Sequence, residues 1–353
     1  MKYYNLSRIE KYEPFDIGVI FGQKGNGKSF CIKERMIKNF IAGRGECVYL
    51  RRFSDEVRQH IVDAYFNDMP IKEWTGGEFD RVVAYQNRLY LANPEEDRKK
   101  WKMFGYYFSL DKEQKYAGIQ LPKVTTVLFD EWFARDYFLH DECYRFMCFL
   151  STLARDNKPK VWLVGNNATK LSPYIAEWGL ERILSMPQGS FFRHKVETNT
   201  PGEFVEIVVE RCPETSRKTN SLIMGRAAKN IAGGEWVTRQ APHLDRPEEE
   251  YHKAYTLVIE KEKMRFLVQL LTAKGEAFLY VTPKTSEPQK GTRLITDQIT
   301  KQGELITYIP EPITPAESPV FYLMRAGKIR YSDNTTAHDF GTVLESYGFG
   351  KTW

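Results

Sequence analysis

The sequence lacks the features of a membrane or secreted protein. No apolar run reaches the roughly 18 residues that read as a membrane-spanning helix. The first residues, MKYYNL, contain no apolar signal core. We therefore expect a cytoplasmic protein without a membrane partner.

Cysteine is sparse, and its spacing excludes a common type of metal site. The five cysteines form no C-x-x-C pair. His140 precedes Cys143 by three residues, but no second pair of ligands follows at zinc spacing. An odd number of cysteines without a secretory signal indicates buried thiols in a reducing compartment. Internal repeats and low-complexity tracts are absent as well.

Neither sign of charge dominates. The chain carries 51 Lys and Arg against 46 Asp and Glu, a net charge of +5. This mild basic excess is compatible with nucleic acid but does not single it out. With 353 residues, 42% hydrophobic and 27% charged, the chain is long enough for two folded domains. The aromatic content of 14% suits packed cores and stacking surfaces.

The most informative motif is a glycine-rich loop that suits a nucleoside triphosphate. Residues 22–29 read G-x-x-x-x-G-K-S, between a strand-like apolar run at 15–21 and a segment at 30–40 with helical spacing. Strand, loop and helix form the context in which this motif cradles phosphates. Glycines admit φ > 0, so backbone N–H groups can point at an anion beside the helix N-terminus. The sequence therefore predicts a site for ATP and Mg²⁺.

Each residue of this loop is a candidate ATP contact. The set is Gly22, Gln23, Lys24, Gly25, Asn26, Gly27, Lys28 and Ser29. We expect Lys28 to reach the β- and γ-phosphates and Ser29 to ligate Mg²⁺. Lys24 is either a second phosphate contact or a solvated loop lysine. The aromatic that stacks on adenine stays open among Tyr3, Tyr4, Tyr12 and Phe15.

Two adjacent carboxylates end an apolar strand about a hundred residues downstream. The run 127–129 leads directly into Asp130 and Glu131. Acids at the C-terminal end of a parallel strand lie where ligands bind in such sheets. We expect Asp130 to hold Mg²⁺, through water or Ser29, and Glu131 to orient and deprotonate the attacking water. The alternative is an ordinary strand that ends in acidic turn residues.

Polar residues also flank the next expected strand, 160–164. We expect Asn167, with Asn166 as second choice, to sense the γ-phosphate or position water, although Asn is also a common turn residue. Arg155 lies at the end of the preceding helix. Such an arginine can act as a finger on a neighbour's γ-phosphate, or it can be an exposed residue favoured by the helix dipole.

Strand-like and helix-like segments alternate through the first half of the chain. Expected strands are 16–21, 47–50, 125–129 and 160–164, and expected helices are 28–41, 55–67 and 141–154. Short strand-like pieces at 81–85 and 88–92 lie in a mixed region, 78–122. The alternation predicts an α/β fold with a predominantly parallel central sheet and helices on both faces.

The pattern changes after about residue 190. Strands are expected at 191–197, 204–211, 255–260, 266–271 and 277–281, a helix at 216–230, and a proline-rich surface loop at 310–319. The polar stretch 213–250 is broken by glycines and prolines. We therefore expect an ATPase domain at 1–212, a linker or lid at 213–250, and a small α+β domain at 251–353.

Four segments follow one another in an order typical of a known family. GQKGNGKS, VYLRRF, LPKVTTVLFDEW and LARDNKPKVWLVGNNA resemble the DNA-packaging ATPases of phi29-like tailed phages. The resemblance covers roughly residues 15–170 and is weaker at 217–226 and 255–281.

The resemblance implies both an architecture and a function. It implies a RecA-like ASCE P-loop ATPase domain, and a C-terminal domain similar to a vestigial nuclease of the ribonuclease-H type. It implies a homomeric ring, thought to be pentameric, on the portal of a procapsid in the cytoplasm of an infected bacterium. Such a ring drives double-stranded DNA inward with ATP and Mg²⁺.

The resemblance also carries roles onto single residues. Residues 22–29 match the phosphate loop, and Asp130 and Glu131 match the metal-binding and catalytic acids. Arg155 lies twelve residues before Asn167, the family's spacing between its arginine finger and its Asn.

A trans-acting lysine and a basic cluster of the family transfer less well. Lys115 is the nearest match to the lysine, but this chain is two residues longer before Pro122, so Lys112 and Lys123 remain alternatives. Arg51 and Arg52 match a family pair. Ser54 stands where the family has its next basic residue, so the DNA contact proposed there does not transfer.

Several activities other than DNA packaging fit the sequence less well. A two-metal nuclease needs several converging carboxylates, and the second domain offers Glu260 and Glu262, with Asp297 as a further candidate. We therefore expect no DNA cleavage. A helicase, initiator or other ring-forming translocase shares the loop and acids, but further helicase motifs are absent. A kinase would not need Glu131, and the intact loop argues against an inert binding protein.

Overall fold

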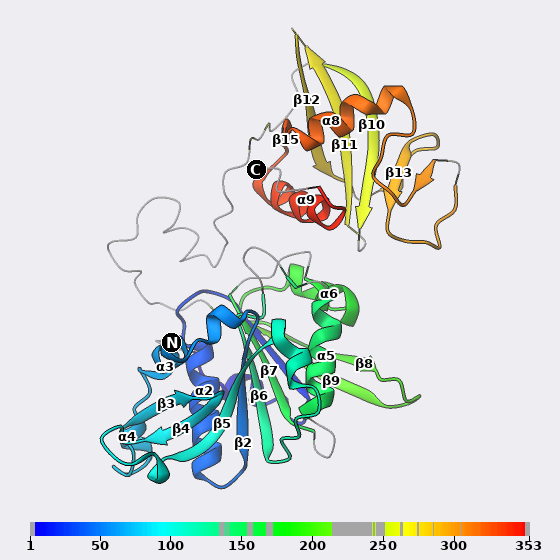
Figure 1. Ribbon diagram of the computed structural model, residues 1–353. Coiled ribbons are helices and arrows are strands. Elements are labelled where there is room, and N and C mark those ends of the chain that lie inside the picture. The colour runs from blue at the N-terminus through cyan, green and yellow to red at the C-terminus, as the bar shows by residue number, and fades with distance from the viewer. Residues whose placement is uncertain are drawn as a thin grey trace. The chain divides into compact units, whose positions relative to one another are not determined.

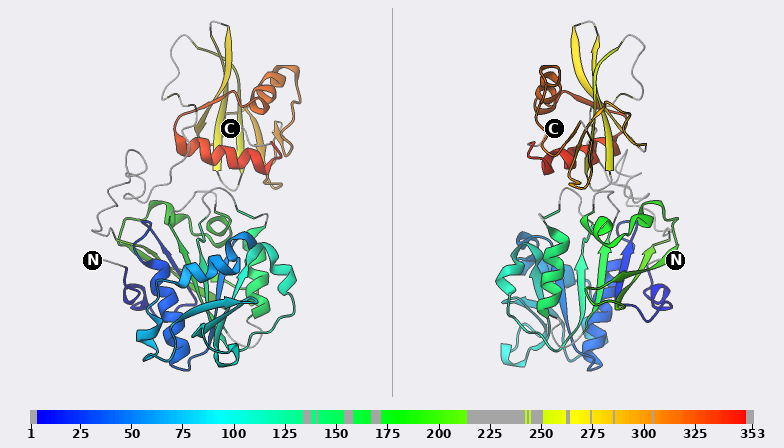
Figure 2. Two further views of the ribbon diagram at one scale, coloured as in Figure 1. Left: turned by 60° about the vertical axis from the view of Figure 1, so that its left-hand side comes forward. Right: turned by 90° about the vertical axis from the view of Figure 1, so that its right-hand side faces the viewer.

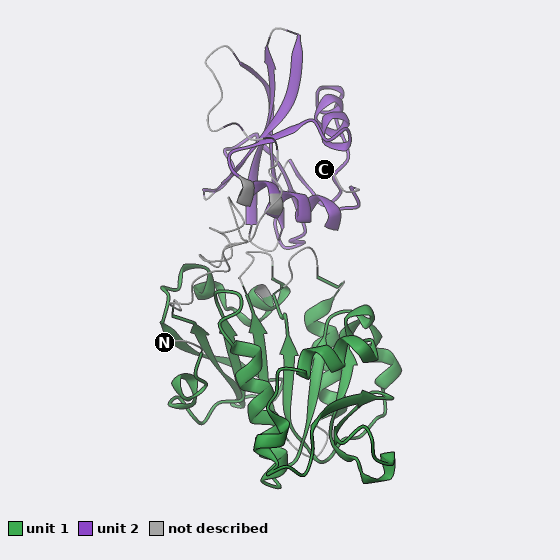
Figure 3. Cartoon of the chain, turned by 90° about the vertical axis from the view of Figure 1, so that its left-hand side faces the viewer, with its two compact units in different colours: residues 1–236 green, residues 237–353 purple. Residues whose placement is uncertain are grey.

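The computed structural model describes most of the chain (Figure 1, Figure 2). The described residues are 4–133, 138–139, 141–153, 158–166, 172–213, 242, 244, 251–261, 264–273, 275–284, 286–303 and 305–349. The chain divides into two compact units, residues 1–236 and 237–353 (Figure 3). The expected helix at 216–230 and nearly all of the expected linker lie outside the described residues.

The centre of unit 1 is a parallel sheet. Its six parallel strands are β1 (Ile17–Phe21), β2 (Glu46–Arg51), β5 (Lys102–Ser109), β6 (Val124–Asp130), β7 (Lys160–Gly165) and β9 (Phe204–Arg211). They lie in the order β5-β2-β6-β7-β1-β9. Every residue of β1 is buried, as expected for a strand covered on both faces. The prediction of an α/β fold with a predominantly parallel sheet is confirmed.

Antiparallel strands extend this sheet at both edges. β3 (Arg81–Tyr85) and β4 (Arg88–Ala92) form a hairpin beside β5, and β8 (Phe191–Glu197) pairs with β9. Gln86 and Asn87 both have positive φ, 47° and 61°, which suits a two-residue hairpin turn. These three strands have the bounds expected from the sequence.

β5 is a strand of unit 1 that sequence reasoning missed. It contains Gly105, and glycine is uncommon inside strands. The structure gives the reason for this glycine, because a Cβ there would lie 2.5 Å from the carbonyl oxygen of Cys47 on β2. The close approach of β2 and β5 therefore requires a residue that weakens the strand pattern.

Helices cover both faces of the unit 1 sheet (Figure 1, Figure 2). The α-helices are α1 (Ser7–Glu10), α2 (Lys28–Ile41), α3 (Gln59–Phe66), α4 (Ile71–Trp74), α5 (Glu142–Leu153) and α6 (Pro173–Trp178). The 3-10 helices are η1 (Ser54–Val57), η2 (Arg98–Lys100), η3 (Leu110–Tyr116) and η4 (Glu181–Ser185). The single helix expected at 55–67 is two helices, because Arg58 between them is extended.

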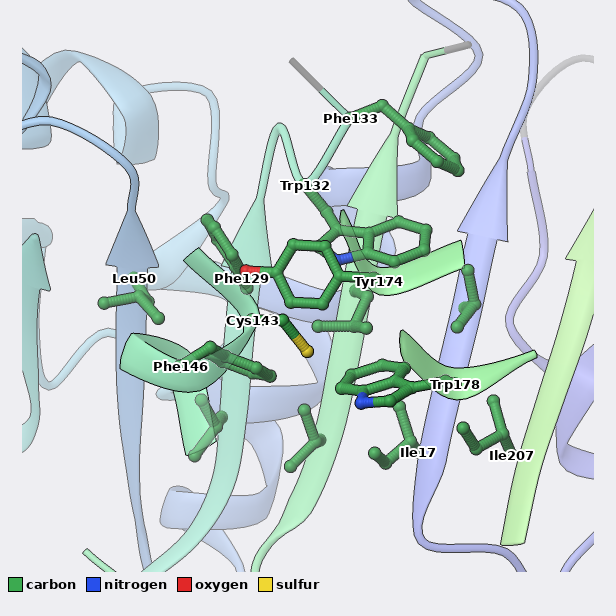
Figure 4. Close-up of a cluster of buried hydrophobic side chains, with 14 of the residues drawn as sticks. Ile17, Leu50, Phe129, Trp132, Phe133, Cys143, Phe146, Tyr174, Trp178 and Ile207 are labelled. Carbon is green, nitrogen blue, oxygen red and sulfur yellow. The ribbon is translucent and has the colours of Figure 1, made fainter. Parts of the chain in front are cut away.

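An aromatic cluster fixes α5 and α6 to the sheet (Figure 4). The ring centroids of Phe129 on β6 and Phe146 on α5 are 5.4 Å apart. Tyr174 and Trp178 of α6 lie 5.2 Å apart, and Trp132 lies 5.2 Å from Tyr174. Since Phe129 and Trp132 flank the two acids in sequence, this packing also fixes the chain on either side of them.

Unit 2 has its own six-stranded sheet. Its strands are β10 (His252–Lys261), β11 (Met264–Ala273), β12 (Glu276–Pro283), β13 (Arg293–Thr296), β14 (Ile306–Thr307) and β15 (Ile329–Tyr331). β10, β11 and β12 form an antiparallel meander, while β13 is parallel to β10 and β15 to β12. The three strands expected between 255 and 281 are thus present and longer than expected.

The helices of unit 2 correct one expectation. They are η5 (Pro315–Glu317), α8 (Ser318–Arg325) and α9 (Asn334–Ser346). The proline-rich segment 310–319 is therefore not all loop. Pro315 and Pro319 stand in the first turns of η5 and α8, where the missing proline N–H costs nothing. In the described part of the chain, no helix combines the length and apolarity needed to cross a bilayer.

Candidate active site

Glycines shape the loop that joins β1 to α2. Gly22, Gly25 and Gly27 have φ values of 145°, 73° and 92°, which are strained for any other residue. Gly27 is also the N-cap of α2. The chain can therefore turn from strand into helix within residues 22–27 and leave the helix N-terminus beside the loop, as the sequence predicted.

Lys28 lies buried inside this loop. Its Nζ donates hydrogen bonds to the carbonyl oxygens of Gln23 at 2.6 Å and Gly22 at 3.2 Å, and to Oδ1 of Asn26 at 3.1 Å. Burial lowers the pKa of Lys28, while the negative charges of Glu131 and Asp130 oppose that shift. The loop thus surrounds a single buried amine, at the position where the motif predicts a phosphate contact.

Asp130 and Ser29 are in contact at the carboxyl ends of the parallel strands. The Ser29 hydroxyl donates to Oδ1 of Asp130 at 2.6 Å, although the two residues are 101 positions apart. The Tyr49 hydroxyl donates to Oδ2 at 3.1 Å, and Arg51 Nη1 lies 3.8 Å from the same oxygen. A hydroxyl and a carboxylate are hard oxygen ligands of the kind that Mg²⁺ prefers. The residues present therefore fit such an ion.

Glu131 adopts an unusual backbone conformation. Its φ is +58°, a left-handed value that few non-glycine residues adopt and that marks functional sites. Its N–H donates to Oδ1 of Asp130 at 3.2 Å, and its carbonyl accepts from Arg52 Nη1 at 3.0 Å. These contacts on both sides hold the strained turn in place.

The Glu131 carboxylate is paired with an amide, and no cation among the described residues forms an ion pair with it. Nδ2 of Asn166 donates to its two oxygens at 2.9 and 3.1 Å. Burial and the neighbouring charge of Asp130 raise the pKa of Glu131, although Arg51 and Lys28 act in the opposite sense. A partly buried carboxylate with a raised pKa is better matched to accepting a proton near neutral pH.

Asn166 joins the three parts of the site. Its Oδ1 lies 3.4 Å from Lys28 Nζ, its carbonyl accepts from the Gly22 N–H at 3.2 Å, and its side chain holds Glu131. The sequence had ranked Asn166 second to Asn167, which lies outside the described residues. Both asparagines follow β7 directly, and a pattern cannot decide which of two neighbouring residues turns toward the loop.

Sequence reasoning missed a buried ion pair behind the acids. Nε and Nη2 of Arg52 donate to the two oxygens of Glu142 at 2.7 and 3.0 Å, and Nη2 also donates to the Trp132 carbonyl at 2.6 Å. The Tyr174 hydroxyl donates to Glu142 at 3.1 Å. Because Arg52 also binds the Glu131 carbonyl, this pair positions the catalytic candidate. The sequence gives no signal that Glu142, 90 residues away, is its partner.

The lysine candidates lie in different surroundings. Lys24 is exposed at the tip of the loop, and its charge opposes the rise in the pKa of Glu131. Lys115 is exposed on η3, which packs against α5, and Lys112 lies 3.7 Å from Asp111. Arg155 lies outside the described residues.

Three of the aromatic candidates for adenine stacking already make other contacts. The Tyr4 hydroxyl donates to Glu210 at 2.5 Å, and the Phe15 ring packs edge-on against Trp162 at 5.6 Å. Tyr12 packs against Phe191, with 4.8 Å between centroids. Tyr3 lies outside the described residues.

The acids of unit 2 stand in a different environment. Glu260 is buried, accepts from Arg265 Nε at 2.6 Å and pairs with Lys301. Burial raises its pKa, but hydrogen bonds from Lys301 and Arg265 outweigh this and lower the pKa below the ordinary value. Asp297 lies 3.9 Å from Lys261 Nζ, and Glu262 is outside the described residues. Over the described residues, no group of three His, Cys, Asp or Glu side chains could hold a metal ion.

Comparison with known proteins identifies the family of this chain. The family of podovirus DNA encapsidation proteins (Gp16) matches residues 1–185. The chain belongs to this family. The resemblance to phi29-like packaging proteins drawn from the sequence is thereby confirmed.

Individual relatives agree with this assignment. The chain is 26% identical over 168 residues to the DNA packaging protein of Bacillus phage B103, covering 46% of this chain and 48% of that protein. It is 25% identical over 183 residues to the DNA packaging protein of Bacillus phage phi29, covering 50% of each. The chain thus spans about half the length of the curated relatives it matches.

A solved structure extends the likeness of fold over nearly the whole chain. The bacteriophage Phi-29 viral genome packaging motor assembly superposes with a TM-score of 0.55 at 17% identity. The match covers 98% of this chain and all of that one. At this level of identity the likeness concerns the fold alone.

Proposed function

We propose that this chain is the ATP-hydrolysing subunit of a motor that packages double-stranded phage DNA into a procapsid. The observation that carries this proposal is the hydrogen bond between Ser29 and Asp130 at 2.6 Å, which joins the glycine loop to the acidic strand. Asn166 contacts both Lys28 and Glu131, so these two side chains belong to the same site. Membership of the DNA encapsidation family supports the packaging role.

The loop residues would hold the nucleotide. Backbone N–H groups of residues 22–29 would face the phosphates, and Lys28 would exchange its loop carbonyl contacts for the β- and γ-phosphate oxygens. Ser29 and Asp130 would hold Mg²⁺, which when bound neutralises charge on those phosphates. Asn167 remains a proposed γ-phosphate contact, and Lys24 a proposed second cation on the phosphates.

Glu131 would orient and deprotonate the attacking water. Its amide contact from Asn166 leaves the carboxylate without a cation within hydrogen-bond distance among the described residues. Arg52 would keep the Glu131 backbone in its left-handed turn during the reaction. The adjacent Asp130 and Glu131 favour hydrolysis over phosphate transfer to a small substrate.

We also propose a fold class and domain bounds for the chain. We assign unit 1 to the RecA-like ASCE class, supported by the position of β7 between β1 and β6. We keep the domains at 1–212, 213–250 and 251–353. The last would be a vestigial nuclease of the ribonuclease-H type that does not cut DNA, supported by the engagement of Glu260 with two cations.

The active site would be completed by a neighbouring subunit in a homomeric ring. Arg155 would reach the neighbour's γ-phosphate as an arginine finger, and Lys115 would act in trans as well. The exposure of Lys115 on η3 is compatible with this role. The ring, pentameric in the family resemblance, would dock on the portal of a procapsid in the cytoplasm of the infected bacterium.

A subunit-mixing experiment tests the shared site. Arg155→Ala and Glu131→Ala subunits are each expected to be inactive alone, and their mixture should regain ATPase activity at interfaces that combine an intact finger with an intact base. If both proteins fold and assemble but the mixture stays inactive, the trans-acting finger is wrong.

DNA dependence tests the motor itself. Hydrolysis should be stimulated by double-stranded DNA without unwinding of the duplex. Unwinding would indicate a helicase, and transfer of phosphate to a small acceptor would indicate a kinase.

A further inference from the structure

The hairpin at the edge of unit 1 has one covered and one open face. Val82, Ala84, Leu89 and Leu91 are buried on the side that packs with α3 and α4. The opposite side, which we name the hairpin face, carries Arg81, Val83, Tyr85, Arg88 and Tyr90, since these residues pair across β3 and β4 in alternate register. Each is partly or fully exposed. Strands β5, β2, β6 and β7 separate this hairpin from β1 and the nucleotide loop (Figure 1).

Flat side chains form a continuous row on the hairpin face. The rings of Tyr90 and Trp101 are 5.9 Å apart. The guanidinium carbon of Arg98 lies 4.4 Å from the ring centroid of Tyr85 and 5.8 Å from that of Trp101. The Trp101 indole donates to the Asn93 carbonyl at 3.3 Å, which fixes the ring against the hairpin. All three rings are partly exposed.

Exposed cations surround this row. Residues 98–102 read RKKWK, and the four basic residues among them are exposed, as is Arg88. Lys100 lies 3.8 Å from Glu96. Asp97 accepts from the Lys99 backbone N–H at 2.9 Å and so caps η2. For Arg88, Arg98 and Lys99, the part of the chain that is described contains no ion-pair partner, so their charge is available to a ligand. Lys102 pairs with Leu91 and lies over the Phe40 ring, on the covered face.

We propose that the hairpin face binds an unpaired strand of nucleic acid. Bases stack on Tyr90 and Trp101, and the phosphates lie against Arg88, Arg98 and Lys99. Exposed aromatics on a sheet are a common platform for unpaired bases, and stacking tolerates any sequence because every base has a flat face. Tyr, Trp and Arg are also common at protein interfaces, but lysines are depleted there, so the lysines of this surface favour a polyanion as the partner.

This surface suits an unpaired strand better than the double-stranded DNA of the proposed motor. A duplex keeps its bases stacked inside, so it could use the cations but not the rings. The row of aromatic side chains therefore selects a strand with accessible bases. The inference does not depend on ATP hydrolysis, because the hairpin lies at the far edge of the sheet from the loop.

Fluorescence anisotropy with the full chain tests the proposal. The probes are labelled oligouridylate and oligothymidylate of about 12 nucleotides, within the usual site size of such surfaces, and a duplex of equal length. Both single strands are expected to bind more tightly than the duplex. Stronger binding of the uridylate would identify RNA as the strand, through its 2′-hydroxyls.

Variants separate stacking from charge. Tyr90→Leu should weaken single-strand binding about tenfold, whereas Tyr90→Phe, which keeps the ring, should bind as wild type. The double variant Arg88→Ala/Arg98→Ala should weaken binding and reduce the slope of log K against log salt by about 1.4. Lys72→Ala, an exposed lysine on α4 beside the covered face, should change nothing.

Several outcomes would overturn the proposal. These are no binding of either single strand, equal binding by Tyr90→Leu and Tyr90→Phe, or duplex binding that Tyr90→Leu weakens as much as single-strand binding. Thermal unfolding and ATP turnover without nucleic acid check that each variant is folded. Absence of ATP turnover in the wild type would refute the proposed motor and leave the hairpin result standing.

Discussion

Two glutamates, the partly buried Glu131 of unit 1 and the buried Glu260 of unit 2, show how surroundings decide what a carboxylate can do. Glu131 directly follows β6 and receives hydrogen bonds from the amide of Asn166. Burial and Asp130 raise its pKa. Glu260 lies near the end of β10, where Arg265 and Lys301 bind its oxygens and lower its pKa despite burial.

The difference separates a reactive group from a structural one. A carboxylate with a raised pKa can take up a proton during a reaction. A carboxylate held between two cations stays ionised and keeps its hydrogen-bond partners, so its role is structural. Arg52 donates a hydrogen bond to the backbone carbonyl oxygen of Glu131 and not to its carboxylate.

Replacing each glutamate by glutamine is the strongest test of this comparison. Glu131→Gln should lower ATP turnover about 10²- to 10⁴-fold, because the general base is lost, while nucleotide binding persists. Glu260→Gln should leave turnover per folded molecule within about twofold, because the described partners of Glu260 all belong to unit 2. Steady-state hydrolysis and binding of a fluorescent nucleotide measure both. Equal losses in the two variants would show that the distinction has no functional meaning.

The buried pair behind Glu131 should carry a large share of unit 1 stability. Arg52→Ala leaves Glu142 buried without its cation, which typically costs about 3–5 kcal/mol. Arg58→Ala, which removes an exposed pair with Asp55, should cost at most about 1 kcal/mol. Urea unfolding measures both free energies. Similar values for the two variants would mean that Arg52 does not anchor the segment after β6.

Acid should affect the two glutamates with opposite sign. The folded pKa of Glu260 is lowered, so its contribution to stability is present above the unfolded pKa of about 4.3 and is lost as pH falls through the folded pKa. The folded pKa of Glu131 is raised, so its ionisation opposes folding as pH rises above about 4.3.

Glu260→Gln tests the contribution of this glutamate to the stability of unit 2. It should cost about 2 kcal/mol at pH 7, less than a fully buried pair because Arg265 and Lys301 partly reach water. The cost should shrink toward pH 3. Hydrogen exchange of β10 amides at the two pH values reports it, and a cost that grows on acidification would reverse the assignment.

The smallest expected effect concerns the hydroxyl that supports Asp130. Tyr49 is fully buried and donates to Oδ2 at 3.1 Å, so Tyr49→Phe should cost about 1 kcal/mol of stability. Loss of this contact should raise the Mg²⁺ concentration needed for half-maximal ATPase activity several-fold. An unchanged Mg²⁺ dependence would remove Tyr49 from the support of the metal site.

Local patterns made much of unit 1 predictable. The glycine spacing at 22–29 and the apolar periodicity on either side define β1, the loop and α2 without reference to distant residues. The two acids at 130–131 follow an unbroken apolar strand. The hairpin strands β3 and β4 have their expected bounds, because each alternates buried and exposed residues around a short turn.

Features that depend on distant contacts were not predictable. Gly105 weakens the strand pattern of β5 in the sequence. The reason for this glycine, the close approach of β2, is seen only in the folded sheet. Arg52 and Glu142 carry no mark of their pairing, and the choice between Asn166 and Asn167 depends on which way one residue turns. Of the two cations around Glu260, Arg265 lies opposite it across the β10–β11 pair, whereas Lys301 lies in the loop after β13 and reaches Glu260 only in the folded sheet.

The central claim is that a triphosphate binds at residues 22–29 and is hydrolysed there. Its most direct test is steady-state ATP hydrolysis by Lys28→Ala beside Lys38→Ala, an exposed lysine further along the same helix. We predict that Lys28→Ala loses turnover while Lys38→Ala keeps the wild-type rate. Hydrolysis by Lys28→Ala at the wild-type rate would contradict the account.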